Sequence, residues 1–257
     1  MRCRTNDCMG TRNGKARMSK KRNKRDIQAE RALTQKIQTT LTGYQDRRKK
    51  GFKYGCYLFF KRAFDIVASL VGLVILSPVI LLCLLAKWLE DFHNPVYVSM
   101  RVGKDGKIFK FYKIRSMRVG AEEMKNELIK QGKNEADGPA FKMKDDPRVT
   151  KVGRFLRKTS IDELLQLWNI LIGNMTIVGP RPPIPAEVED YEPEHMQRLL
   201  VKGGLLCYWQ IQKNRNDIPF EEWVRLDMEY IDNQSFWLDI KIIFKGAYMV
   251  LFDRSGE

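Results

Sequence analysis

The chain has 257 residues, 44% of them hydrophobic, and a formal net charge of +15, so it can bury a sizeable core. Its five cysteines and two histidines show no zinc-ligand spacing, which excludes a zinc-binding module and indicates reduced cysteines. The first 50 residues are too long and too polar to begin a secretory signal peptide.

The positive charge is concentrated at the beginning of the chain. Residues 1–62 contain 19 of the 46 Lys and Arg residues but 4 of the 31 Asp and Glu residues, so the remainder is neutral overall. We predict a basic arm over residues 1–60, disordered or partly helical. Its charge runs fit attraction to anionic lipid head groups, nucleic-acid binding or simple solvation, and the apolar segment that follows favours lipid.

This apolar segment runs from Ala63 to Ala86 with one charge, Asp65, and is long enough to span a bilayer. However, Ser77-Pro78 lies inside it, and proline kinks a helix. At about 1.5 Å per residue the two arms reach only about 21 and 14 Å, short of the ~30 Å hydrocarbon core. A kinked span conflicts with the positive-inside rule, whereas a re-entrant helix-break-helix over residues 61–90 keeps both ends cytoplasmic. The residues alone leave both arrangements open.

A β-hairpin is predicted next. The runs Pro95–Met100 and Ile108–Ile114 alternate apolar and polar side chains on either side of a glycine-containing basic turn. In and after the second strand, Lys113 and Arg115 alternate with apolar neighbours. The basic residues of the turn fit solvation and a functional role equally: Arg101, Lys104 and Lys107. An amphipathic helix is then expected over Ala121–Gln131.

The centre of the chain is a pair of adjacent carboxylates, Asp162 and Glu163, which begin an apolar-periodic helix. Five cations precede them: Arg148, Lys151, Arg154, Arg157 and Lys158. A carboxylate can attack phosphorus or hold a divalent ion, and arginines bind phosphate oxygens, so this pattern suits a metal-bound phosphate substrate. Ser160 and Glu163 also match a capping box, in which the two acids would only stabilise a helix start.

The remaining elements are a short buried strand and two helices. Met175–Val178 is the strand, and the rigid turn after it, Gly179–Pro182, aims Arg181 either at a phosphate or at solvent. Helices are expected over Glu221–Asp232 and from Ser235 onward. The last helix is apolar enough for the membrane interface or for core packing. Together the elements predict an α/β mixed (α+β) fold, mainly helical with a small sheet.

Three segments carry a resemblance to a known family. They are KFYKIRSM (Lys110–Met117), DPRVTKVGRFLRKTSIDELLQLWNIL (Asp146–Leu171) and GNMTIVGPRP (Gly173–Pro182). Their order and spacing resemble the bacterial sugar transferases, specifically the monotopic polyprenyl-phosphate phosphoglycosyl transferases, from about Lys61 to about Phe252. Two departures weaken any inference about the sugar. Lys202–Gln210 lacks the family's Pro and Thr-Gly pair, and Leu165 stands where many members have Pro.

The resemblance implies a reaction and assigns roles. A sugar-1-phosphate would pass from a UDP-sugar to a polyprenyl (undecaprenyl) phosphate, with release of UMP, to begin exopolysaccharide, capsule or glycoconjugate assembly. Asp162 would be the nucleophile that forms a covalent aspartyl-phosphosugar, and Glu163, with Asp162, would hold Mg²⁺. The other implied site residues are the phosphate contacts Arg157, Arg181 and Lys113, the supporting residues Arg115 and Asp239, and the membrane break at Ser77 and Pro78. For Asp239, a helix-start dipole role remains the alternative.

The expected organisation follows from the same resemblance. Residues 91–257 would form a cytoplasmic catalytic domain with interfacial helices, on the cytoplasmic face of the inner membrane. The predicted partners are a UDP-sugar, a polyprenyl phosphate and anionic inner-membrane lipid, with a homodimer left open and no nucleic acid. The alternative hypothesis is a membrane-attached scaffold of a polysaccharide assembly complex without catalytic activity.

Overall fold

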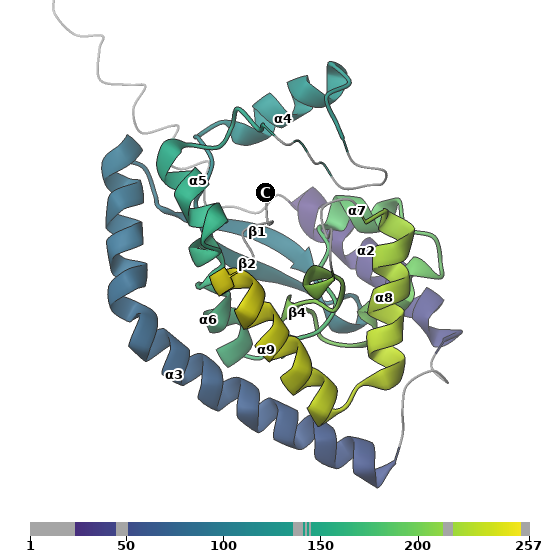
Figure 1. Cartoon of the computed structure of the whole chain (residues 1–257). Coiled ribbons are helices and arrows are strands. Elements are labelled where there is room, and N and C mark those ends of the chain that lie inside the picture. Colours follow the sequence, from purple (N-terminus) through teal and green to yellow (C-terminus); the bar gives the residue numbers. More distant parts are fainter. Residues whose placement is uncertain are drawn as a thin grey trace, which may run out of the picture.

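The computed structural model describes residues 24–44, 51–135, 141, 143, 145–212 and 218–252. Within these residues the protein is mainly helical with two small two-stranded sheets, as predicted in outline (Figure 1). In chain order the elements are α2 (Lys24–Thr42), α3 (Phe52–Asp91), β1 (Val96–Val102), η2 (Lys104–Gly106), β2 (Ile108–Ile114), α4 (Ala121–Lys130), α5 (Lys151–Lys158), η3 (Ile161–Glu163), α6 (Gln166–Leu171), β3 (Thr176–Val178), α7 (Pro185–Glu189), η4 (His195–Leu200), β4 (Gly204–Leu206), η5 (Trp209–Ile211), α8 (Phe220–Asn233) and α9 (Phe236–Phe252).

Helix α2 packs against the rest of the protein. Leu33, Ile37 and Leu41 recur at helical spacing and are buried in a core cluster with residues of β1, α7 and η4. The Thr34 hydroxyl also donates a hydrogen bond to the Gly106 carbonyl at 2.9 Å. The arm over residues 1–60 is predicted to be disordered or partly helical, and Lys24–Thr42 is a helical part of it. Residues 1–23 and 45–50 of that arm lie outside the described residues.

Helix α3 is the longest element, and within the described residues it is the one helix long and apolar enough to cross a membrane. It begins at Phe52, inside the predicted arm, and continues through Pro78 without interruption. Figure 1 shows that α3 changes direction along its length. The Ser77 hydroxyl donates to the Val74 carbonyl at 2.8 Å, so it occupies one carbonyl in the turn before the proline. The predicted break at Ser77-Pro78 is thus contained within one continuous helix.

The two long faces of α3 have different surroundings. Leu73 and Leu76 pack against a core cluster that contains Phe109, Leu167 and Ile170. The opposite face leaves large apolar side chains exposed, which at the bilayer surface would contact lipid. These include Phe59, Phe60, Val67, Val74, Ile75, Leu81 and Leu82. Helix α3 therefore lies along the body with an apolar outer face.

Both ends of α3 are bonded to the same body. Near its beginning, Lys61 forms an ion pair of 2.6 Å with Asp239 of α9. Near its end, the fully buried Lys87 donates to the Thr150 hydroxyl at 3.2 Å, and Asp91 pairs with Arg115 at 2.6 Å. The body thus holds both ends of the apolar helix.

The two sheets place the loops around the site. Strands β1 and β2 pair antiparallel, with Val96 opposite Ile114, and the buried Asn169 of α6 bonds the β2 backbone at Lys110 and Tyr112. Strands β3 and β4 pair parallel. A Cβ on Gly204 would lie 2.1 Å from the Gly179 nitrogen, so glycine is needed for the close approach of the Gly179–Pro182 turn to β4.

Candidate active site

A cavity of about 970 Å³ lies between β1, β2, α4, α5, η3 and the turn after β3. The sequence-predicted residues that line it are Lys113, Arg115, Arg157, Asp162, Glu163 and Arg181. Further lining side chains come from distant segments, among them Arg101, Ser116, Arg148, Glu187, Trp209 and Gln210. Among the described lining residues, eight basic side chains outnumber five acidic ones, so the cavity suits an anionic ligand.

The carboxylate pair lies on a tight turn between two short helices. Helix α5 ends at Lys158, Ser160 has a left-handed backbone with φ of 55°, and Asp162 and Glu163 belong to the 3₁₀ turn η3. The Ser160 side chain makes no capping bond, so the capping-box interpretation is wrong. A non-glycine residue with positive φ is uncommon and is held there by its surroundings. The turn directs both acids to one cavity instead of placing them on the first turn of a long helix.

Asp162 is 6% exposed, and its Oδ2 lies 4.0 Å from the Lys113 ammonium. Burial raises the pKa of Asp162, and the neighbouring Glu163 adds to this effect, while Lys113, Arg157 and Arg181 oppose it. The carboxylate is thus poorly solvated but surrounded by cations. Such an environment favours attack on an electrophile over strong hydration of the anion.

Glu163 has a closer partner. Its Oε1 lies 2.6 Å from the Lys113 ammonium. Burial opposes ionisation, but Lys113 and Arg181, together with hydrogen bonds from Lys113 and Gln166, lower the pKa of Glu163 to about 2. Glu163 is therefore a permanent anion near neutral pH. The two neighbouring acids have pKa values shifted in opposite directions, a pattern typical of carboxylates with separate roles.

The arginines are positioned by backbone and hydroxyl contacts. Arg157 donates from Nε to the Ser116 hydroxyl at 2.9 Å. Arg101 donates to the Pro182 carbonyl at 3.0 Å, which anchors the turn that carries Arg181. Burial, and then the nearby Arg181, lower the pKa of Arg101 to about 10. Within the described part of the chain no carboxylate lies within ion-pair distance of Arg181. An anionic ligand would relieve this concentration of positive charge.

The other residues predicted for the site are either paired with acids at the cavity wall or lie outside the cavity. Arg148 lines the cavity but is held by Asp146, with a shortest contact of 2.6 Å. Arg115 also lines it and pairs with Asp91. Three cations of the basic run do not line it: Lys151, Arg154 and Lys158. Asp239 does not line the cavity and is buried against Lys61, Tyr57 and Tyr230 in a separate cluster.

Several residues that position the site were not predicted from the sequence. Lys87 and Glu90, at the end of α3, bond Thr150 and the Val152 nitrogen and so hold the beginning of α5. Asn169 ties α6 to β2. The available signals were a lysine at the edge of an apolar run and an asparagine on an apolar stripe. Neither residue type is expected in such a place unless it is paired.

Gly153 controls the placement of Arg157. A Cβ at this position would lie 1.8 Å from the Ser116 carbonyl oxygen, which is backbone and cannot swing away. We expect Gly153→Ala to displace α5, reduce the free energy of unfolding by about 2–3 kcal/mol and lower activity. Thermal unfolding in detergent measures the change. Gly55→Ala in α3, where a Cβ meets nothing within 4 Å, is the control and should be neutral or slightly stabilising. Equal stability of both variants would contradict this packing argument.

Asp239 provides a test of structural against catalytic roles. In Asp239→Asn, the Lys61 ammonium loses its carboxylate although its side chain is only 13% exposed. We expect a loss of roughly 3 kcal/mol in unfolding free energy, because a partly buried charge is left unpaired. The KM for the donor should be unchanged in the folded fraction. A raised KM with unaltered stability would instead return Asp239 to the substrate site.

The oxygen donors of Asp162 and Glu163 are of the kind that Mg²⁺ prefers. Within the described ranges, no group of three or more His, Cys, Asp or Glu side chains could enclose a metal ion. Mg²⁺ is commonly held by one or two carboxylates together with water and substrate phosphate oxygens, and Asp162 and Glu163 open onto a cavity large enough for these. The residues therefore fit an ion that arrives with a phosphate substrate.

Comparison with known proteins places this cavity in context. Residues 56–253 match the family described as "Bacterial sugar transferase", and this range contains every described residue that lines the cavity. Galactosyl transferase CpsE of Streptococcus agalactiae is 44% identical over 208 residues, covering 81% of this chain and 45% of that protein. Undecaprenyl-phosphate galactose phosphotransferase of Salmonella typhimurium is 43% identical over 198 residues, covering 75% and 40%.

A third relative is matched along most of its length. Exopolysaccharide production protein ExoY of Rhizobium meliloti is 37% identical over 198 residues, covering 76% of this chain and 87% of that protein. By contrast, the chain spans less than half the length of the first two relatives. The family match nevertheless extends over most of the chain and carries the site with it. The protein belongs to the bacterial sugar transferase family.

Proposed function

We propose that the protein transfers a sugar-1-phosphate from a UDP-sugar to undecaprenyl phosphate and releases UMP, as an initiating step of polysaccharide or capsule synthesis. The observation that carries the proposal is the Asp162–Glu163 pair, which faces Lys113, Arg157 and Arg181 in one cavity. The names of the relatives agree with it, because the Salmonella typhimurium protein is an undecaprenyl-phosphate galactose phosphotransferase. An Escherichia coli relative, 40% identical over 209 residues, uses UDP-glucose and undecaprenyl phosphate.

The proposed chemistry has two displacements at one phosphorus. A carboxylate oxygen of Asp162 attacks the phosphorus next to the sugar, and the bond to the bridging oxygen breaks, so that UMP leaves with the electron pair. An oxygen of the polyprenyl phosphate then attacks the same phosphorus. The bond to Asp162 breaks, and the free carboxylate is regenerated. Arg157 and Arg181 bind the phosphate oxygens throughout, while Lys113 keeps Glu163 ionised and in place.

Glu163 and Asp162 would hold Mg²⁺ together with the diphosphate. When bound, the ion would neutralise phosphate charge and so favour departure of UMP. The opposed pKa shifts support this division of labour. Glu163, with a pKa of about 2, remains an anion available to the metal, whereas the desolvated Asp162 is the better nucleophile.

We further propose that α3 enters the cytoplasmic leaflet and returns. The support is that both ends of the helix bond the same body, through Lys61–Asp239 at one end and Asp91–Arg115 at the other. A straight span would separate those ends by the full bilayer thickness. Large apolar side chains are also exposed on neighbouring helices and suit an interfacial position: Phe155, Trp168, Ile172, Phe236, Trp237 and Phe244. The cavity would then lie at the cytoplasmic membrane face, within reach of both substrates.

A donor screen tests the proposed function. The purified chain, undecaprenyl phosphate and Mg²⁺ are mixed with individual UDP-sugars, UMP is measured, and the lipid product is identified by mass spectrometry. We expect one or a few donors to give UMP and a matching lipid-linked sugar diphosphate. Release of UDP in place of UMP would indicate glycosyl transfer and contradict the proposal. Absence of product with every donor, from a folded and membrane-bound chain, would favour a scaffold.

A further inference from the structure

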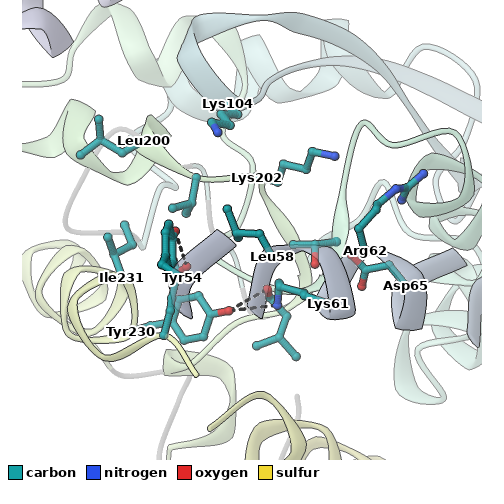
Figure 2. Close-up of a pocket in the computed structure, with 14 residues that line it drawn as sticks. Tyr54, Leu58, Lys61, Arg62, Asp65, Lys104, Leu200, Lys202, Tyr230 and Ile231 are labelled. Atoms are coloured by element: carbon teal, nitrogen blue, oxygen red, sulfur yellow. Dashed lines mark hydrogen bonds between the residues drawn. The ribbon is translucent and has the colours of Figure 1, made fainter. Parts of the chain in front are cut away.

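A second cavity, of about 310 Å³, lies on the side of the body where α3 begins (Figure 2). Its walls come from the first turns of α3, from β3, from the segment Leu200–Lys202 and from α8. Among the described residues, it shares no lining residue with the cavity that contains Asp162. Its volume falls at the lower end of the range of ligand pockets. It is therefore a separate site, which the proposed reaction does not use.

The lining of this cavity is amphipathic. Four cations face it from three parts of the chain: Lys61, Arg62, Lys104 and Lys202. The other described lining residues include the apolar Leu58, Val178, Leu200, Val201 and Ile231, and one carboxylate, Asp65. Figure 2 shows Leu58 pointing up from α3 toward Lys202, with Tyr54 and Ile231 on one side and Arg62 on the other. The walls thus match a molecule with an anionic group attached to an apolar chain.

Among the described residues, two of these cations, Lys104 and Lys202, have neither an ion pair nor a side-chain hydrogen bond. Lys61 pairs with Asp239, and Arg62 donates to the carbonyls of Ile170 and Leu171 at 2.7 and 2.8 Å. Within the described ranges, no carboxylate lies within ion-pair distance of Lys104 or Lys202.

Besides burial, repulsion among these cations contributes to a lowered pKa of Lys202. Burial, and then Arg62, lower the pKa of Lys202, with a further contribution from Lys104, and the opposing effect of Asp65 does not cancel these. Asp65 itself accepts a hydrogen bond from the Ile177 nitrogen at 3.0 Å, which commits one of its oxygens to β3. An incoming anion would therefore find unpaired positive charge already in place.

The position of the cavity indicates where that anion comes from. Its α3 wall includes Leu58, Lys61 and Arg62, which lie in the same turns of the helix as Phe59, 70% exposed, and Phe60, 63% exposed; the two phenylalanines do not line the cavity. These turns precede the apolar part of the helix, so the cavity lies at the boundary between the polar body and the apolar outer face. A phosphate at this level, with its chains along the apolar surface, is the arrangement of a membrane phospholipid.

We propose that this cavity binds the head-group phosphate of an anionic phospholipid, held by Lys104 and Lys202, and so fixes the depth at which the body sits on the membrane. The inference goes beyond the proposed transfer reaction and does not depend on the chemistry of Asp162. A polyprenyl phosphate has the same phosphate chemistry, but an acceptor must reach Asp162, which this separate cavity does not contain.

The test is native mass spectrometry of the full chain released from detergent that contains phosphatidylglycerol or phosphatidylcholine. We expect wild type to retain one phosphatidylglycerol and to prefer it over phosphatidylcholine. The double variant Lys104→Gln/Lys202→Gln should bind phosphatidylglycerol at least about tenfold more weakly. Lys130→Gln/Lys133→Gln removes two exposed lysines that line neither cavity and should change nothing. Lys104→Arg/Lys202→Arg should retain the lipid, which separates lost charge from lost folding.

Two further arms identify the source of the phosphate. Millimolar inorganic phosphate should not displace phosphatidylglycerol, because it cannot use the apolar wall, and displacement would overturn the assignment to a lipid. A short-chain prenyl phosphate should bind equally well to wild type and to Lys104→Gln/Lys202→Gln. Loss of prenyl phosphate with retention of phosphatidylglycerol would overturn the proposal, as would equal lipid loss in the Lys130/Lys133 control.

Discussion

Asp162→Asn is expected to lower UMP release by at least about 1,000-fold while leaving the fold intact, because an amide cannot form the aspartyl-phosphosugar. The substitution preserves the shape of a side chain that is 6% exposed and removes its charge. Donor binding should persist, since Arg157 and Arg181 remain. The measurement is UMP formation together with donor binding by calorimetry.

The matched control for this experiment is Asp190→Asn. Asp190 is an exposed aspartate at the end of α7 and does not line the cavity. It should retain full activity. If Asp162→Asn also released UMP at a rate near that of wild type, Asp162 would be a structural acid, and the proposed covalent step would have to be abandoned.

Lys113→Met is expected to reduce activity by about 10- to 100-fold and to change its pH dependence. In wild type the pKa of Glu163 is about 2, so the side chain stays ionised throughout a working range of roughly pH 5 to 8. Without Lys113, whose ammonium lies 2.6 Å from Oε1, the effect of burial is less opposed and the pKa of Glu163 rises. A growing fraction is then protonated as the pH falls, so the variant should lose relatively more activity at acidic pH than wild type.

Complete pH–rate profiles of wild type, Lys113→Met and Lys113→Arg test this linkage. Lys113→Arg keeps the positive charge and should keep the acidic limb near the wild-type position, even if the altered geometry lowers the rate. An acidic limb at the same pH in wild type and Lys113→Met would mean that Lys113 does not control the ionisation of Glu163. The lysine would then act on substrate alone.

Local patterns predicted the elements whose residues contact one another within a short span. Strand β2 has the predicted bounds Ile108–Ile114, and α4 ends one residue before the predicted Gln131. In the strand, Phe109 and Phe111 are buried on one face and Lys110 between them is exposed on the other, as alternation requires. The acids and arginines of the site were also recognisable, because their residue types carry the phosphate chemistry and their spacing resembles the family.

Contacts between residues far apart in the sequence determine the features that local patterns did not predict. The motif from Ser160 to Glu163 reads locally as a helix cap, but the chain turns there with positive φ and buries Asp162. Asp239 pairs with Lys61 across a separation of 178 residues, which no local pattern encodes. Arg101, predicted in the hairpin turn, belongs to β1 and donates to the carbonyl of Pro182. Such contacts exist only once α3, α9 and the two hairpin strands have assembled.

The most direct test of the account is the mass of the intact chain after mixing with the donor found in the screen, with Mg²⁺ and without acceptor lipid. We predict a mass increase of one sugar phosphate on wild type, located on Asp162 by peptide mapping. The adduct should disappear when undecaprenyl phosphate is added, and it should be absent from Asp162→Asn. An active enzyme that never carries the adduct, or an adduct that forms equally on Asp162→Asn, would contradict nucleophilic catalysis by Asp162.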